Sequence, residues 1–117
     1  MFHEKIKNMS KLIQITQENI NEILNASEKL LVLEFYAEWC PPCKALMPVL
    51  EVLSQEYADK AIFAKVDVDK FINITSEYGI RKIPHLLILK NGELIKNIGV
   101  VDPKAKAFLQ QHLDALI

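Results

Sequence analysis

Short hydrophobic runs divide the chain into candidate strands. The run LLVLEFYA (30–37) is almost continuously apolar, which is typical of a strand buried on both faces of a sheet. The run AIFAKVDVD (61–69) has the same character and ends in acidic residues that suit a turn. A shorter run, LIQI (12–15), is a third candidate. These segments predict the first strands of one sheet.

Three segments with helical spacing of hydrophobic residues follow these runs. Thr16 is a suitable N-cap for a short amphipathic helix. A longer helix is predicted from Pro42 to about Tyr57. A third is predicted over residues 70–78, because Gly79 suits the end of a helix. Each helix therefore links one candidate strand to the next.

The last third of the chain predicts a hairpin and a closing helix. Two alternating segments within residues 85–99 are joined by Asn91-Gly92, a strong hairpin signal. Asp102 is expected to cap the closing helix, with Pro103 in its first turn. The predicted order is βαβαβαββα, and its strand–helix alternation implies parallel strands with antiparallel edges added by the hairpin. We therefore expect an α/β fold with a central mixed sheet.

Composition and charge limit the classes of function. A chain of 117 residues fits one domain, and we expect residues 1–9 to be a flexible extension of a domain formed by residues 10–117. The net charge of −1 gives no electrostatic reason to expect a nucleic acid or an anionic membrane as partner. The N-terminal segment has lysines but no apolar stretch after them, so we expect no secretory signal and a cytoplasmic location.

Cys40 and Cys43 are the only cysteines, and they lie where a predicted strand gives way to a helix. Side chains three apart on a helical turn are neighbours, within the range that a disulfide bridges. Free N–H groups and the positive end of a helix favour a thiolate. We therefore expect Cys40, nearer the helix end, to be the nucleophile and Cys43, one turn deeper, to be the resolving thiol.

The cysteines have two other possible interpretations. Structural zinc takes four ligands, and the remaining candidates, His3, His85 and His112, show no paired spacing. Inert core cysteines are the second alternative. A reactive pair explains the C-x-x-C context better than either, and we expect no metal.

The segments FYAEWCPPCKALMPVLE, AKVDVD and YGIRKIPHLLILKNGE together resemble thioredoxin, and the similarity covers about residues 10–117. The resemblance implies a three-layer α/β/α sandwich, with about five strands and four flanking helices. It also implies a thiol–disulfide oxidoreductase that reduces client protein disulfides without a bound cofactor. An NADPH-dependent thioredoxin reductase, a flavoprotein, would regenerate it, and we expect a monomer.

The resemblance also assigns roles to individual residues. Pro84 matches the cis-proline that faces the cysteine pair, and Ile83 would offer its backbone to a substrate. Trp39 flanks the nucleophile, and Gly99 matches a glycine of the docking surface. The expected substrate-binding residues are Trp39, Pro41, Pro42, Ile83, Pro84 and Gly99.

The chain departs from the family at Glu34, where thioredoxins typically have a buried aspartate. A buried carboxylate without a partner is costly, so Glu34 should be neutral, paired or hydrated. Lys65, in the adjacent predicted strand, matches the family's lysine. We expect Glu34 to accept the proton of Cys43 through water, the alternative being a carboxylate that reaches the edge of the sheet.

A second departure is Pro41, where thioredoxins typically have glycine. Proline lacks an N–H and fixes φ near −65°, so the loop loses a donor and becomes stiffer. The sign of the effect on the reduction potential does not follow from sequence.

Two other functions stay open. One is a thiol oxidant of an oxidising compartment, as in cytochrome maturation, and the other is an adaptor that binds partners in either redox state.

Overall fold

A computed structural model describes residues 10–25 and 28–117. The predicted extension of residues 1–9 lies outside them. Helices and strands follow in the order β1 (Leu12–Gln14), α2 (Ile20–Leu24), β2 (Leu30–Tyr36), α3 (Pro41–Glu56), β3 (Ala61–Asp67), α4 (Ile72–Glu77), β4 (His85–Lys90), β5 (Glu93–Val100) and α5 (Lys106–Leu116). The predicted order is confirmed. None of the helices in this part of the chain is long and apolar enough to cross a membrane.

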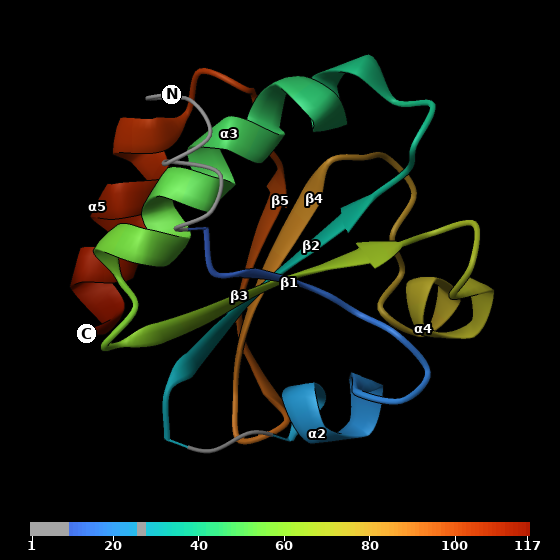
Figure 1. Cartoon of the computed structure of the whole chain (residues 1–117), viewed down its shortest axis with the longest axis horizontal. Helices are drawn as coiled ribbons and strands as arrows, with labels where there is room; N and C mark the ends of the chain where they lie inside the picture. Colours follow the sequence, from blue (N-terminus) through green and yellow to red (C-terminus); the bar gives the residue numbers. More distant parts are fainter. Residues whose placement is uncertain (1–9, 26–27) are drawn as a thin grey trace.

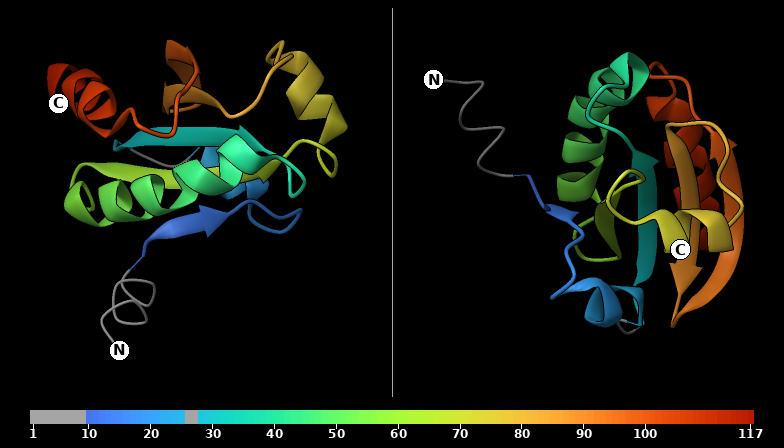
Figure 2. Two further views of the ribbon diagram at one scale, coloured as in Figure 1. Left: turned by 90° about the horizontal axis from the view of Figure 1, so that it is seen from above. Right: turned by 90° about the vertical axis from the view of Figure 1, so that its right-hand side faces the viewer.

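The five strands form one mixed sheet in the order β1-β3-β2-β4-β5. The strands β1, β3 and β2 run parallel, and β4 is antiparallel to both β2 and β5. Helices α3 and α5 cover one face, whereas α2 and α4 lie on the other (Figures 1 and 2). The three-layer α/β/α sandwich is therefore confirmed.

The central strand β2 is buried along its whole length. Val32 packs into the core under α3 and α5, whereas Leu33 and Phe35 pack into the core under α2 and α4. Both faces of β2 are covered, which explains its nearly continuous apolar sequence. Because side chains alternate along a strand, Glu34 shares the face of Val32 and lies beneath α3.

The predicted hairpin between β4 and β5 is confirmed. Asn91 and Gly92 both have positive φ angles, 53° and 81°. Such angles at both central positions belong to a type I′ turn, which matches the twist of the flanking strands.

Two helices start later than predicted. The helix α2 begins at Ile20 because Thr16 and Asn19 close a turn before it: the Asn19 N–H donates to Thr16 Oγ1 at 3.2 Å, and the Thr16 N–H donates to Asn19 Oδ1 at 2.8 Å. The helix α5 begins at Lys106, because Asp102 accepts from the Lys104 N–H at 2.7 Å within a separate turn. Both polar residues satisfy local N–H groups, but they do so one turn before the helix.

Candidate active site

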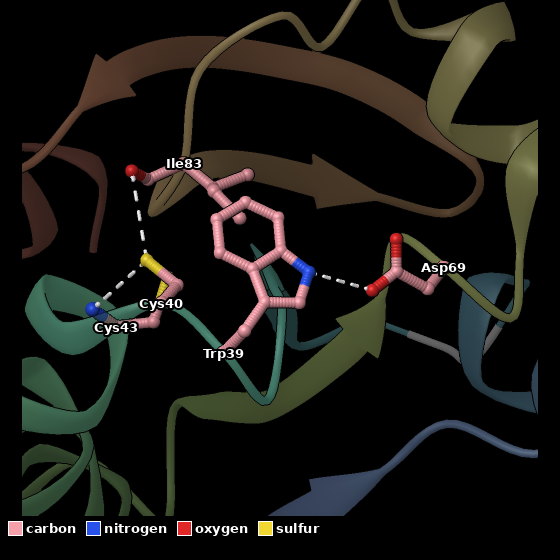
Figure 3. Close-up of a disulfide and its surroundings, with 5 residues drawn as sticks. All are labelled: Trp39, Cys40, Cys43, Asp69 and Ile83. Carbon is pink, nitrogen blue, oxygen red and sulfur yellow. Dashed lines mark hydrogen bonds between the residues drawn. A yellow bond between two sulfur atoms is a disulfide. The ribbon is translucent and has the colours of Figure 1, made fainter.

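The cysteine pair lies at the N-terminus of α3, at the carboxyl end of β2. Cys40 is the N-cap residue, and the Cys43 N–H donates to the Cys40 sulfur at 3.3 Å (Figure 3). The two residues form a disulfide, with their Cα atoms 5.3 Å apart. The exposed fraction is 3% for Cys40 and 0% for Cys43. The oxidised pair is therefore buried, with Cys40 as the outer residue.

The two prolines shape the hydrogen bonding at this helix end. Pro41 and Pro42 are the first two residues of α3, and both are exposed. Neither has an N–H, so the first free N–H group of the helix belongs to Cys43. That group points at the Cys40 sulfur. The helix end thus directs one N–H donor at the atom where negative charge develops in a thiolate.

The segment before β4 lies against the pair from the other side. The Ile83–Pro84 peptide bond is cis. The Ile83 carbonyl oxygen lies 3.9 Å from the Cys40 sulfur (Figure 3), and Ile83 packs against the buried cluster that contains both cysteines. Pro84 is buried, and its carbonyl accepts from the Val101 N–H at 3.1 Å. Residues more than forty positions apart in sequence therefore meet at the disulfide.

Trp39, next to Cys40 in the sequence, is largely exposed to solvent. Its side chain is 67% exposed, and its indole N–H donates to Asp69 Oδ2 at 2.8 Å (Figure 3). Asp69 was not predicted to belong to the site, because the sequence marked it only as one of the acidic residues at the end of a predicted strand. The parallel pairing of β2 and β3 was the available signal, because it brings the carboxyl ends of both strands to one edge of the sheet. In the described part of the chain, no group of three or more His, Cys, Asp or Glu residues could hold a metal ion.

Glu34 is fully buried between two strands, with 1% of its surface exposed. It lies opposite Lys65 in β3 and Leu86 in β4. Neither carboxyl oxygen has a hydrogen-bond partner among the described residues. Burial raises the pKa of Glu34 from its ordinary value of 4.5 to about 8, and the positive charge of Lys65 opposes this rise only in part. Glu34 is therefore mainly protonated at neutral pH.

Lys65 lies beside Glu34 in the sheet, but its ammonium group is directed elsewhere. The Lys65 Nζ lies 3.6 Å from the Met47 sulfur. It also lies over the Tyr36 ring, 5.1 Å from the ring centroid. The parallel register thus brings the two residues together without an ion pair between them in the described residues.

Gly99 lies in β5 and His85 begins β4. Gly99 pairs with Leu86 and has a φ angle of 91°, a conformation that favours glycine. His85 is half-buried at the start of β4, and its Nε2 is 2.7 Å from Asn97 Oδ1. Both residues are anchored in the sheet near Pro84.

Comparison with known proteins identifies the family. A family model described as thioredoxin matches residues 11–115. Thioredoxin C-2 of Corynebacterium nephridii is 42% identical over 105 residues, covering 87% of this chain and 96% of that protein. The thioredoxin of Buchnera aphidicola is 36% identical over 108 residues, covering 91% of this chain and all of that protein.

A solved structure agrees with these sequences. The thioredoxin NaTrxh from Nicotiana alata superposes with a TM-score of 0.79 at 33% identity, covering 91% of this chain and 92% of that one. The similarity therefore extends over the whole sheet and the helices on both of its faces. The chain belongs to the thioredoxin family, and it is a protein disulfide reductase that acts by dithiol–disulfide exchange through Cys40 and Cys43.

Proposed function

We propose that Cys40 is the attacking thiolate and Cys43 the resolving thiol. The Cys40 thiolate attacks one sulfur of a client disulfide, forms a mixed disulfide and releases the other client sulfur as a thiolate. Cys43 then loses its proton, and its sulfur attacks the Cys40 sulfur. The products are the Cys40–Cys43 disulfide and a reduced client, so two electrons pass to the client. The observation that carries this assignment is the N-cap position of Cys40, whose sulfur accepts the Cys43 N–H.

Glu34 is the proposed proton acceptor for Cys43, through a water molecule, with Lys65 as its charged neighbour. Its pKa of about 8 is close to that of an ordinary thiol, about 8.5, so transfer between the two groups costs little free energy. Its place on the α3 face of β2 supports the role, because α3 contains Cys43 and begins directly after Cys40. The carboxyl must be ionised to act, so the resolving step is expected to become faster as pH rises towards 8.

The client segment is proposed to lie extended beside Ile83 and Pro84. The proximity of the Ile83 carbonyl to the Cys40 sulfur supports this placement, since an extended chain pairs through its backbone groups. Pro41 and Pro42 form an exposed rim beside the disulfide, and Trp39 forms another. Gly99 would line the same docking surface.

The partners follow from the same chemistry. We propose disulfide-containing proteins as clients and an NADPH-dependent flavoprotein, thioredoxin reductase, as the electron donor. The protein is proposed to work as a cytoplasmic monomer.

Trapping of the mixed disulfide tests the order of attack. The Cys43→Ser variant is expected to accumulate a covalent adduct with oxidised insulin, visible by mass spectrometry and reversed by dithiothreitol. The Cys40→Ser variant is the matched control, and it should give little adduct because its remaining thiol is fully buried in the parent chain. An adduct that forms mainly in the Cys40→Ser variant would reverse the two roles.

Pro41 is expected to affect the reduction potential of the Cys40–Cys43 pair. Pro41→Gly restores a potential N–H donor near the Cys40 sulfur and loosens the loop. We expect the reduction potential to change by more than about 10 mV, given that about 30 mV corresponds to 1.4 kcal/mol. Equilibration with glutathione buffers measures the potential. A parent value well above the cytosolic glutathione poise would favour the thiol-oxidant function instead.

A further inference from the structure

Glu34 and Lys65 form no ion pair, which was one of the arrangements that the sequence left open, although the two residues are directly opposite each other in β2 and β3. The Lys65 ammonium instead has two other partners. One is the thioether of Met47, from α3, at 3.6 Å, and the other is the ring of Tyr36, at 5.1 Å from its centroid. Both are weaker partners for an ammonium group than a carboxylate.

Two weak partners can together hold a lysine when the competing carboxyl is neutral. A thioether sulfur is a weak acceptor, and a cation–π contact contributes about 0.5–2 kcal/mol depending on its exposure. Neither requires the ammonium to lose all its water, because Lys65 is half-buried. The position of Met47 on α3 therefore affects how closely the lysine approaches Glu34.

We propose that Met47 is a positioning residue whose thioether, with the Tyr36 ring, holds the Lys65 ammonium away from the Glu34 carboxyl. The consequence for catalysis rests on the proposed role of Glu34 as proton acceptor. A lysine held by Met47 and Tyr36, outside an ion pair with Glu34, leaves Glu34 a strong enough base to take a thiol proton, whereas a close ion pair would make it a weaker base.

Lys65 is the charged group through which Met47 acts on Glu34. On β3, Lys65 is opposite Glu34, and the buried Asp67 lies two residues further along the same face, where its carboxyl accepts a backbone N–H. On β4, the residue opposite Glu34 is the apolar Leu86. The α3 face contributes apolar core residues and the two cysteines. On β2 itself the next titratable side chain of this face is Tyr36, whose own pKa is raised to about 12, chiefly by burial. A change at Met47 should therefore reach Glu34 mainly through the lysine.

Titration of the Glu34 carboxyl by carbon-13 NMR tests the proposal without any assay of activity. Met47→Leu keeps the volume of the side chain but removes the sulfur acceptor. The freed lysine should approach the carboxylate and lower the titration midpoint of Glu34 by about 1 pH unit. Met47→Gln supplies an amide oxygen in place of the sulfur, so its midpoint should stay at the parent value.

The same substitution in a Lys65→Met chain separates the effect of the lysine charge from the effect of core packing. In a Lys65→Met chain no ammonium can move, so adding Met47→Leu should leave the Glu34 midpoint unchanged. Amide spectra of each variant establish that the fold is retained, and Lys65→Met alone should raise the midpoint, because it removes a favourable charge. The proposal is overturned if Met47→Leu leaves the midpoint unchanged in a folded protein, or if it shifts the midpoint equally with and without Lys65.

Comparing the Glu34 midpoint with the pH profile of disulfide reduction separates the role of Met47 from the proposed catalytic role of Glu34. If the midpoint falls in Met47→Leu while the pH profile of disulfide reduction stays fixed, Met47 positions the lysine but Glu34 is not the proton acceptor. If both move together by the same amount, the positioning role and the proposed proton transfer are supported together.

Discussion

Two buried carboxyl side chains on neighbouring strands differ in their hydrogen bonding. Glu34 lies in the middle of β2 and Asp67 at the end of β3, with 1% and 3% of their surfaces exposed. Asp67 accepts a hydrogen bond from the Asp69 N–H at 2.9 Å, whereas the oxygens of Glu34 have no partner among the described residues. Burial alone therefore does not determine whether a carboxyl group is satisfied.

The position of each residue along its strand explains the difference. In mid-sheet the backbone N–H groups are already paired across the strands, so β2 offers none to Glu34. At the end of β3 the chain turns, and the turn has N–H groups to donate. The carboxyl of Asp67 at the strand end thus accepts a hydrogen bond, whereas burial raises the pKa of the Glu34 carboxyl in mid-strand.

The largest effect is expected on the pH dependence of stability in Glu34→Leu. With a pKa raised from 4.5 to about 8, folded Glu34 holds a proton that the unfolded chain releases. The free energy of unfolding therefore keeps the full contribution of this proton below pH 4.5. It falls as pH rises to about 8, by up to about 5 kcal/mol. The variant should lack this loss in urea unfolding at several pH values. Retention of the full loss would show that Glu34 does not cause it, and Asp67→Ala, which keeps Glu34, is the control.

The next effect is on catalysis in Glu34→Ala. We expect insulin reduction at neutral pH to slow by about 10- to 100-fold, at or below the lower end of the range for general base catalysis. The rise of the rate as pH approaches 8 should also disappear. Asp67→Ala should keep the parent profile. An unchanged profile in Glu34→Ala would remove Glu34 from the mechanism.

A smaller effect is expected on stability in Asp67→Ala. The Asp69 N–H loses its acceptor, which should cost about 1–2 kcal/mol in urea unfolding. Asp67→Asn keeps an acceptor oxygen and should lose less. If both variants are as stable as the parent chain, the hydrogen bond of Asp67 has no structural role.

The smallest effect is expected in Asp69→Ala. Trp39 loses the acceptor of its indole N–H, so its ring should become more mobile, seen as lower fluorescence anisotropy. Because Trp39 is mostly exposed, we expect kcat/KM for insulin to change by at most about 5-fold. Asp69→Asn retains an acceptor and is the matched control. A loss of activity as large as that in Glu34→Ala would contradict this ranking.

Much of the fold was predictable from local patterns. The apolar run of β2 and the Asn91-Gly92 turn each carry a strong signal, and both predictions are confirmed. The starts of α2 and α5 were wrong by several residues, because Thr16 and Asp102 form turns before the helices. Polar residues that bond to nearby N–H groups suit both a cap and a turn, so sequence alone does not separate the two.

Local sequence identifies the chemistry through a C-x-x-C pair where a strand meets a helix and a carboxyl within an apolar strand, and the resemblance to thioredoxin implies a cis-proline opposite the pair. How these groups interact follows only from the folded arrangement of the strands and helices. The indole of Trp39 bonds to Asp69, and the ammonium of Lys65 turns to Met47 instead of Glu34. Such contacts depend on the register of β2 against β3 and on the packing of α3 over the sheet. Register and helix packing arise from interactions between segments that are distant in the sequence. The local spacing of residues therefore does not predict these contacts.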